Sequence, residues 1–202
     1  REALVWLRSR LPDRPAYHVW ANFEFTTQSG QIYEVDALAI TDNGVHLLEI
    51  KGYPGRIDGD ANTWQWTRPD GTFSQFDNPR LLANRKAKAI KSLLLNTKAF
   101  RKNRNDLPFI SESVFLSDPK LVSGLNPQGR FGVFGRDGAT KDEALPPERE
   151  ALGGILDHLQ SLDPDEQGRK RHRLDPRVVD RLVKAMEEIG IRERSSRREV
   201  GD

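Results

Sequence analysis

The stretch at residues 33–52, YEVDALAITDNGVHLLEIKG, constrains the fold more than any other part of the chain. Two apolar runs of strand length are joined by TDNG, a sequence that favours a turn. Asp36 lies inside the first run, and Glu49 and Lys51 lie inside the second. Charged side chains among apolar strand residues indicate a specific role for those charges.

The spacing of these charges sorts them by strand face. Side chains alternate across a strand, so Glu34 and Asp36 share one face, and Glu49 and Lys51 share another. If the two strands pair antiparallel about the turn, the carboxylates of Asp36 and Glu49 lie at similar heights and converge. Converging carboxylates repel each other unless a cation lies between them.

A small set of hard oxygen ligands, with room left for water and phosphate oxygens, suits Mg²⁺. A lysine beside such a cation can position or deprotonate a water, or offset charge on a phosphate. The pattern is therefore that of metal-assisted phosphodiester hydrolysis. The alternative is a solvated sheet, because antiparallel sheets usually have one wet face. The apolar neighbours at residues 35–40 and 46–52 favour a covered sheet instead.

The rest of the chain predicts helices around a mixed sheet, which is an α/β fold. The expected elements are a helix at 2–11, strands at 17–27, 31–40 and 45–52, a hairpin at 64–76, a helix at 78–100 and a strand at 109–117. Asn78 is the expected cap of the second long helix, with Pro79 in its first turn. Two further helices are expected, one starting at residues 146–150 and one capped by Asp175. We expect a core at 1–143, a helical extension at 144–191, and a disordered tail or linker at 192–202.

Composition excludes several kinds of protein. The chain of 202 residues has no cysteine, which rules out a disulfide scaffold, a thiol nucleophile and cysteine-ligated zinc. That fits a cytoplasmic protein. No apolar run approaches membrane-spanning length, so no membrane partner is expected. The net charge is only +2, so any positive surface must be local. The chain begins without methionine and ends in a charged run, and we expect it to be part of a longer protein.

The order of elements and motifs resembles the PD-(D/E)xK nuclease superfamily, and more closely its nuclease-related domain. The matching pieces are Glu2 on the first helix, EVDALAI, NGVHLLEIKGYPGRI, and a tryptophan hairpin that runs into NPRLL. The resemblance covers roughly residues 2–120. It implies a restriction-endonuclease-like core and nuclease activity on nucleic acid, with DNA the expected partner and RNA the alternative. The implied cofactor is Mg²⁺, with Mn²⁺ as an alternative.

The resemblance also implies roles for individual residues. Asp36 and Glu49 are the implied metal ligands, with water and the backbone carbonyl of Ile50 completing the shell. Lys51 is the implied catalytic lysine, and Glu2 an outer acidic partner in catalysis. Glu34 is an extra acid that ranks below them.

One feature of the resemblance is missing. Several relatives carry a glutamine shortly after the Asn-Pro pair, whereas this chain has Leu81, Leu82 and Asn84 there. Asn84 supplies the nearest amide. The missing glutamine supports a different class of function, a degenerate nuclease fold that only binds nucleic acid.

The helix at 78–100 is basic. Six of its cations are candidates for contact with a nucleic-acid backbone: Arg80, Arg85, Lys86, Lys88, Lys91 and Lys98. With the RKNRN run at 101–105, they form the most basic region of the chain. Such contacts hold phosphates without selecting sequence. The alternative is an ordinary solvated helix face. Trp64 and Trp66 share a strand face and could stack on bases, although such pairs more often pack against a sheet.

The C-terminal third resembles, less specifically, the N-terminal region of large bacterial proteins in which a Ser/Thr protein kinase domain follows. Those proteins are linked to phage defence of the BREX or phage-growth-limitation type. This chain has no kinase motif. The resemblance implies a kinase domain beyond residue 202 and other phage-defence proteins as partners. It leaves open a third function, a protein-interaction module that regulates the kinase.

Overall fold

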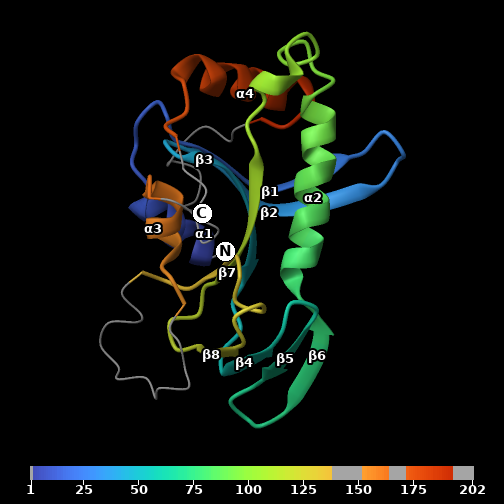
Figure 1. Ribbon diagram of the computed structural model, residues 1–202. Coiled ribbons are helices and arrows are strands. Elements are labelled where there is room, and N and C mark those ends of the chain that lie inside the picture. Colours follow the sequence, from blue (N-terminus) through green and yellow to red (C-terminus); the bar gives the residue numbers. More distant parts are fainter. Residues whose placement is uncertain (1, 138–151, 164–171, 193–202) are drawn as a thin grey trace, which may run out of the picture.

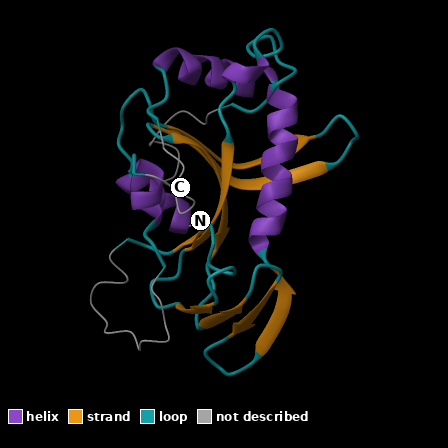
Figure 2. Cartoon of the chain, viewed as in Figure 1, coloured by secondary structure: helices purple, strands orange, loops and turns teal. Residues whose placement is uncertain are grey.

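The computed structural model describes residues 2–137, 152–163 and 172–192, and its described part is a mixed α/β structure with two sheets (Figures 1 and 2). The central sheet has the strand order β1-β2-β3-β7-β9, and the smaller sheet has the order β6-β5-β4-β8. The strands of the central sheet are β1 His18–Thr26, β2 Ile32–Thr41, β3 Gly44–Lys51, β7 Ile110–Leu116 and β9 Val133–Phe134. Those of the smaller sheet are β4 Arg56–Gly59, β5 Thr63–Thr67, β6 Phe73–Asp77 and β8 Val122–Leu125. The predicted α/β class with a mixed sheet is confirmed.

Helices cover both faces of the central sheet (Figure 1). The helices are α1 Glu2–Arg10, α2 Pro79–Leu94, α3 Ile155–Gln160 and α4 Pro176–Glu188, with a 3₁₀ turn η1 at Arg104–Asp106. On one face, Leu38 and Leu47 join the core formed with α2 and α4. On the other face, Ala37 and Leu48 pack with α1 and α3. The alternation between neighbouring residues is the period of two expected for a sheet buried on both sides.

Pairing in the central sheet changes direction at β3. The pairs β1–β2 and β2–β3 are antiparallel, whereas β3–β7 and β7–β9 are parallel. The predicted turn at TDNG joins β2 to β3, with Thr41 opposite Gly44. A strand that follows a crossover lies parallel to its neighbour, and α2 lies within the connection from β3 to β7. This crossover places α2 against the sheet.

The ends of α2 and α4 follow the predicted capping chemistry. The Asn78 side chain accepts the backbone N–H of Arg80 at 2.9 Å, and the Asp175 side chain accepts that of Arg177 at 2.8 Å. Both helices have proline in the first turn, where a missing N–H costs nothing. Helix α2 ends at Leu94, and turns and bends follow to residue 102, where continuous helix was predicted to 100.

The predicted hairpin at 64–76 is confirmed as β5 and β6. Strands β4 and β8 were not predicted, because each has only four residues and includes a glycine. The predicted start of the first C-terminal helix lies outside the described residues, and α3 begins at Ile155. The domain boundaries stay a prediction, although α4 shares the core of the central sheet. No helix in the described ranges is long and apolar enough to cross a membrane.

Candidate active site

The candidate active site begins where β2 separates from β3. The antiparallel pairing of these strands runs from Thr41 opposite Gly44 to Ala37 opposite Leu48, and Asp36 is the next residue along β2. Figure 1 shows the β1–β2 hairpin leaving the sheet and passing alongside α2. Asp36 therefore lies at the end of a regular ladder, where a side chain can replace a strand hydrogen bond.

The carboxylate of Asp36 takes that role. Its Oδ2 accepts the backbone N–H of Ile50 at 2.7 Å. On the other side of β2, the β1–β2 register pairs Ala21 with Ala37 and Phe23 with Val35. Asn22 lies between these pairs and has a left-handed backbone, with φ of 51°. Asparagine tolerates this conformation better than most residues. The hydrogen bond from Ile50 directs the Asp36 carboxylate toward β3.

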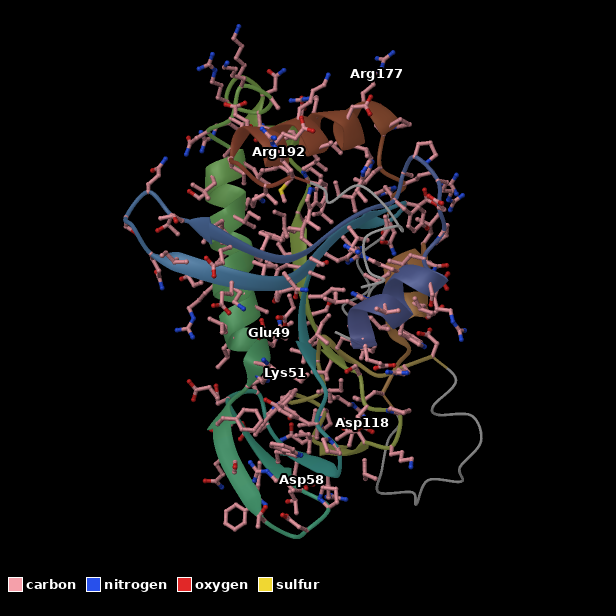
Figure 3. All side chains as sticks on the ribbon, turned by 180° about the vertical axis from the view of Figure 1, so that it is seen from behind. Glu49, Lys51, Asp58, Asp118, Arg177 and Arg192 are labelled. Atoms are coloured by element: carbon pink, nitrogen blue, oxygen red, sulfur yellow. The ribbon has the colours of Figure 1, made fainter. Side chains whose placement is uncertain are left out.

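Glu49 is a buried carboxylate held by two lysines. Its side chain is 6% exposed. Oε1 accepts a hydrogen bond from Nζ of Lys51 at 2.8 Å, and Oε2 accepts one from Nζ of Lys86 at 2.6 Å. Lys51 follows Glu49 on β3, whereas Lys86 comes from α2. Seen from behind, Figure 3 shows Glu49 and Lys51 near the end of β3 beside α2.

Strand periodicity explains why these charges meet. Val45 and Leu47 belong to the core beneath α2, and Glu49 and Lys51 continue the same face of β3. The predicted shared face of Glu49 and Lys51 thus points toward α2. Asp36 belongs to the same cluster: its carboxylate is partly buried, and the charges of Glu49 and Lys51 both act on it.

The electrostatics of the cluster follow from burial. Burial raises the pKa of Asp36, and the negative charge of Glu49 adds to this, while the Ile50 N–H and the charges of Lys51 and Lys86 oppose it. Burial alone would lower the pKa of Lys51, but its hydrogen bond to Glu49 and the Glu49 charge outweigh that effect and raise it. The formal charges of two carboxylates and two ammonium groups cancel.

The oxygen donors of Asp36, Glu49 and the Ile50 carbonyl fit a hydrated Mg²⁺, provided that Glu49 can exchange a lysine contact for the cation. Two carboxylates and the Ile50 carbonyl are few ligands, and Mg²⁺ keeps several waters. Within the described residues, no group of three or more His, Cys, Asp or Glu side chains is placed to hold a metal. Both oxygens of Glu49 already accept lysine hydrogen bonds. A cation at Glu49 would therefore compete with these lysines for the carboxylate.

Two predicted acids lie outside this cluster. The side chain of Glu2 is 72% exposed and pairs with Arg136, whose Nε donates to the carbonyl of Ser117 at 2.6 Å. In the described part of the chain, Glu2 makes no contact with Asp36 or Glu49. Glu34 is exposed on the hairpin, opposite Glu24 of β1.

The predicted basic residues of α2 divide into two groups. Arg80 pairs with Glu112 at 3.1 Å and lies over the ring of Phe131, and Lys86 is buried against Glu49. Of the others, Arg85 and Lys88 are exposed on α2, and Lys91 is half-buried near Phe109. Lys98 lies in the turns beyond the end of α2 and is also exposed. Contact with nucleic acid stays a prediction for the outward group.

Lys86 is the site residue whose role sequence reasoning missed. It had been grouped with the surface cations, yet it lies three residues after Ala83 and four before Ile90, which are both buried on the inner stripe of α2. Helical periodicity was the signal that could have found it. At the positions near the missing glutamine, Leu81 and Leu82 are exposed and Asn84 is half-buried.

The tryptophans pack within the smaller sheet. Trp64 is fully buried. Trp66 stacks on Tyr53 with ring centroids 4.6 Å apart, and the guanidinium of Arg68 lies 4.1 Å from the Trp66 ring. The Trp66 indole N–H also donates to the carbonyl of Pro54 at 2.7 Å. These contacts correspond to sheet packing, the alternative to base stacking.

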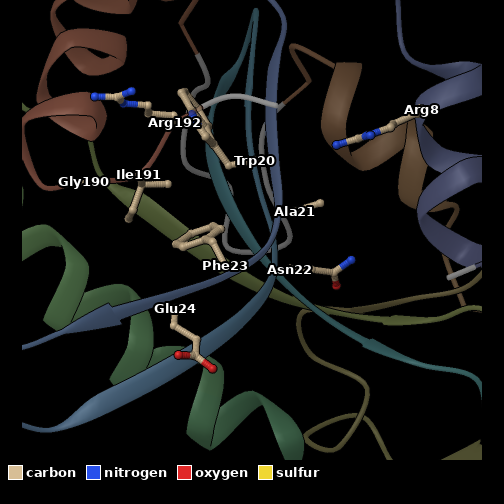
Figure 4. Close-up of a pocket in the computed structure, with 9 residues that line it drawn as sticks. All are labelled: Arg8, Trp20, Ala21, Asn22, Phe23, Glu24, Gly190, Ile191 and Arg192. Carbon is tan, nitrogen blue, oxygen red and sulfur yellow. The ribbon is translucent and has the colours of Figure 1, made fainter. Parts of the chain in front are cut away.

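A cavity of about 360 Å³ lies away from this cluster, between β1 and the end of α4 (Figure 4). Its lining includes Arg8, Asn22, Glu24 and Arg192. The cavity is one strand removed from Asp36 and includes neither Glu49 nor either lysine of the site. It adds nothing to the chemistry of the cluster.

The fold and the cluster define a restriction-endonuclease-like class of protein. The chain belongs to the nuclease-related domain family, whose model matches residues 1–117. It is 30% identical over 201 residues to the probable kinase PglW of Streptomyces coelicolor, an alignment that covers all of this chain and 11% of that protein. It is 31% identical over 106 residues to an uncharacterised protein of Bacillus anthracis, covering 51% of this chain and 45% of the relative. The chain thus spans about a tenth of the length of the first relative and under half of the second. No solved structure matches.

Proposed function

We propose that this chain is a Mg²⁺-dependent nuclease domain that hydrolyses phosphodiester bonds in DNA or RNA, with Mn²⁺ able to replace Mg²⁺. One observation carries the proposal: Asp36 and Glu49 lie in one charged cluster with Lys51, at the point where β2 leaves β3. Membership of the nuclease-related domain family supports the same chemistry.

Asp36, Glu49 and the carbonyl of Ile50 would hold the cation. When bound, the cation would polarise the scissile phosphate and lower the pKa of a water. The Ile50 N–H keeps the Asp36 carboxylate in place through a 2.7 Å hydrogen bond. Asp36 would thus be fixed by a backbone group, which favours a defined geometry for this ligand.

Lys51 would act as a charged hydrogen-bond donor. A general base works best when its pKa lies near the operating pH. The pKa of Lys51 is instead raised, because its bond to Glu49 outweighs its burial. Lys51 would therefore orient the attacking water or stabilise charge on the phosphate, rather than remove a proton.

The outward cations of α2 would hold the substrate backbone. Arg85 and Lys88 are exposed on this helix, and the loop at 101–105 that follows it is exposed as well. Contacts of this kind are independent of sequence and weaken steeply with salt. The proposed substrate is therefore a nucleic acid recognised by its backbone.

The biological setting is also a proposal. The Streptomyces coelicolor relative is named a probable kinase. We infer that this domain works in the cytoplasm, alongside a kinase domain of a longer chain and other proteins of a phage-defence system. In that setting, cleavage of nucleic acid would be the effector step.

A second function is favoured by a specific observation. Both oxygens of Glu49 are bound to lysines, so the cluster is electrically balanced without a metal. A degenerate nuclease fold that only binds nucleic acid could have the same balanced cluster, because it needs no metal there. A module that only contacts a kinase is a third function, and it would bind no nucleic acid.

The test uses the purified chain with labelled single-stranded DNA, double-stranded DNA and RNA, each with Mg²⁺, Mn²⁺ or EDTA. We expect cleavage that requires the divalent cation and is lost in Asp36→Ala and Lys51→Ala. Gel shifts at several salt concentrations run in parallel. Binding without cleavage in the wild type would establish the binding-only function, and the absence of both would favour the kinase module.

A further inference from the structure

Lys86 is placed unlike any other cation of α2. Its side chain is 7% exposed, whereas that of Lys51, the other lysine on Glu49, is 26% exposed. Nζ of Lys86 lies 2.6 Å from Oε2 of Glu49. A buried ammonium is costly unless a carboxylate accompanies it, and a buried carboxylate is costly without a cation. The two side chains therefore depend on each other for their place in the core.

The ammonium of Lys86 also acts on more than one carboxylate. Its charge reaches Asp36 as well as Glu49. Lys51 holds the other oxygen of Glu49 from the same strand, two residues away. Lys86 comes instead from a separate element, so its bond to Glu49 joins α2 to β3. Lys86 therefore occupies one of the two oxygens of a carboxylate that the proposed cation would bind.

We propose that Lys86 is an internal counter-cation of the site. It neutralises and orients Glu49 when no metal is bound, and it competes with a divalent cation for that carboxylate. This inference rests on the proposed function, because it assigns the divalent cation to Asp36 and Glu49. It makes Lys86 a positioning residue and not a catalytic one.

Two effects of opposite sign follow from removing the Lys86 charge. The metal-free protein loses stability, because Glu49 stays buried with less compensation. Divalent cations bind more tightly, because an ammonium no longer repels them from the same carboxylate. A lysine with a merely structural role would produce only the first effect.

The experiment measures Mg²⁺ and Mn²⁺ binding by isothermal titration calorimetry, and thermal unfolding with and without metal. The proteins are the wild type, Lys86→Met and the control Lys184→Met, which changes an exposed lysine of α4. In Lys86→Met we expect metal affinity about tenfold higher. This gain corresponds to only part of the repulsion between an ammonium and a divalent cation on the same carboxylate. We expect a lower Tm without metal that saturating Mg²⁺ restores. Lys184→Met should match the wild type in both.

Lys86→Gln guards against a Lys86→Met protein that does not fold, since its amide can still donate to Glu49 without the charge. Metal affinity in either variant equal to or below that of the wild type would overturn the counter-cation role.

Cleavage assays on the same proteins separate this inference from the nuclease proposal. Tighter metal binding in the variants with no cleavage by any of the proteins would support the counter-cation and reject the nuclease. Cleavage by the wild type with unchanged metal affinity in the variants would do the reverse. Metal binding by none of the proteins would reject both.

Discussion

Helix α2 carries lysine and arginine residues on two faces, and their contribution to the stability of the fold differs between the two. On its inner side, Lys86 and Arg80 are paired with the sheet carboxylates Glu49 and Glu112. On its outer side, Arg85 and Lys88 are exposed. The inner cations stabilise buried acids, and breaking such a pair is expensive. The outer cations sit in water, where their removal costs the fold little. Burial, and not residue type, decides which lysine belongs to the site.

The largest effect should come from breaking the inner pair at its acid. Glu49→Gln would leave Lys86 buried without a carboxylate, and we expect a loss of about 3–5 kcal/mol in the free energy of unfolding. Urea denaturation without metal measures it. The double variant Glu49→Gln with Lys86→Met should recover much of the loss, since neither charge then stays buried alone. Additive losses would contradict the pairing.

A change at Asp36 should separate activity from stability. Burial raises the pKa of Asp36, so folding disfavours its charged form relative to the unfolded chain. Asp36→Asn is uncharged and can still accept the Ile50 N–H. We expect cleavage to fall by about 10²-fold or more, while the Tm stays equal to that of the wild type or rises. A large fall in Tm would show that the ionised carboxylate supports the fold.

The same pKa shift predicts a pH dependence. Asp36 must be ionised to bind a cation. Because its pKa is raised, cleavage should fall with acid at a higher pH than an ordinary aspartate would give. The sign is reversed for the stability of the metal-free protein: the contribution of Asp36 is greatest below its unfolded pKa and is lost as pH rises through its folded pKa. A pH–rate profile measures the first effect, and an acid limb at the usual aspartate range would contradict it.

Changes on the outer side of α2 should act on binding alone. Arg85→Ala and Lys88→Ala should each weaken nucleic-acid binding and reduce the salt slope of log K by about 1. The free energy of unfolding should change by no more than about 0.5 kcal/mol. Fluorescence anisotropy across a salt series measures the slope, with Lys184→Ala as the control. An unchanged slope would mean that this face does not hold the backbone.

The smallest effect is expected at Glu2. Its carboxylate is largely exposed and pairs with Arg136, and ion pairs of this kind contribute about 0–1 kcal/mol. Glu2→Ala should leave metal affinity unchanged and cleavage within about twofold of the wild type. The metal titration provides the measurement. A large loss of metal affinity would instead support the role that the family resemblance implies for this residue.

Much of this arrangement could be predicted from local patterns. Period-two alternation in residues 33–52 placed Glu49 and Lys51 on one face, and capping chemistry at Asn78 placed the start of α2. The hydrogen bond from Ile50 to Asp36 was not predictable, because it depends on where the β2–β3 ladder ends, and local patterns do not fix that point. The partner of Glu2 was equally hidden, since Arg136 lies 134 residues away. Lys86 was predicted to lie on the surface because the prediction followed its charge and not its position on the apolar stripe of the helix.

The claim that Asp36 and Glu49 share a divalent cation is tested most directly by diffraction from crystals soaked in Mn²⁺. The account predicts an anomalous peak bound by both carboxylates, with Nζ of Lys86 displaced from Glu49. No peak at this position under saturating Mn²⁺, with both lysines still on Glu49, would contradict it.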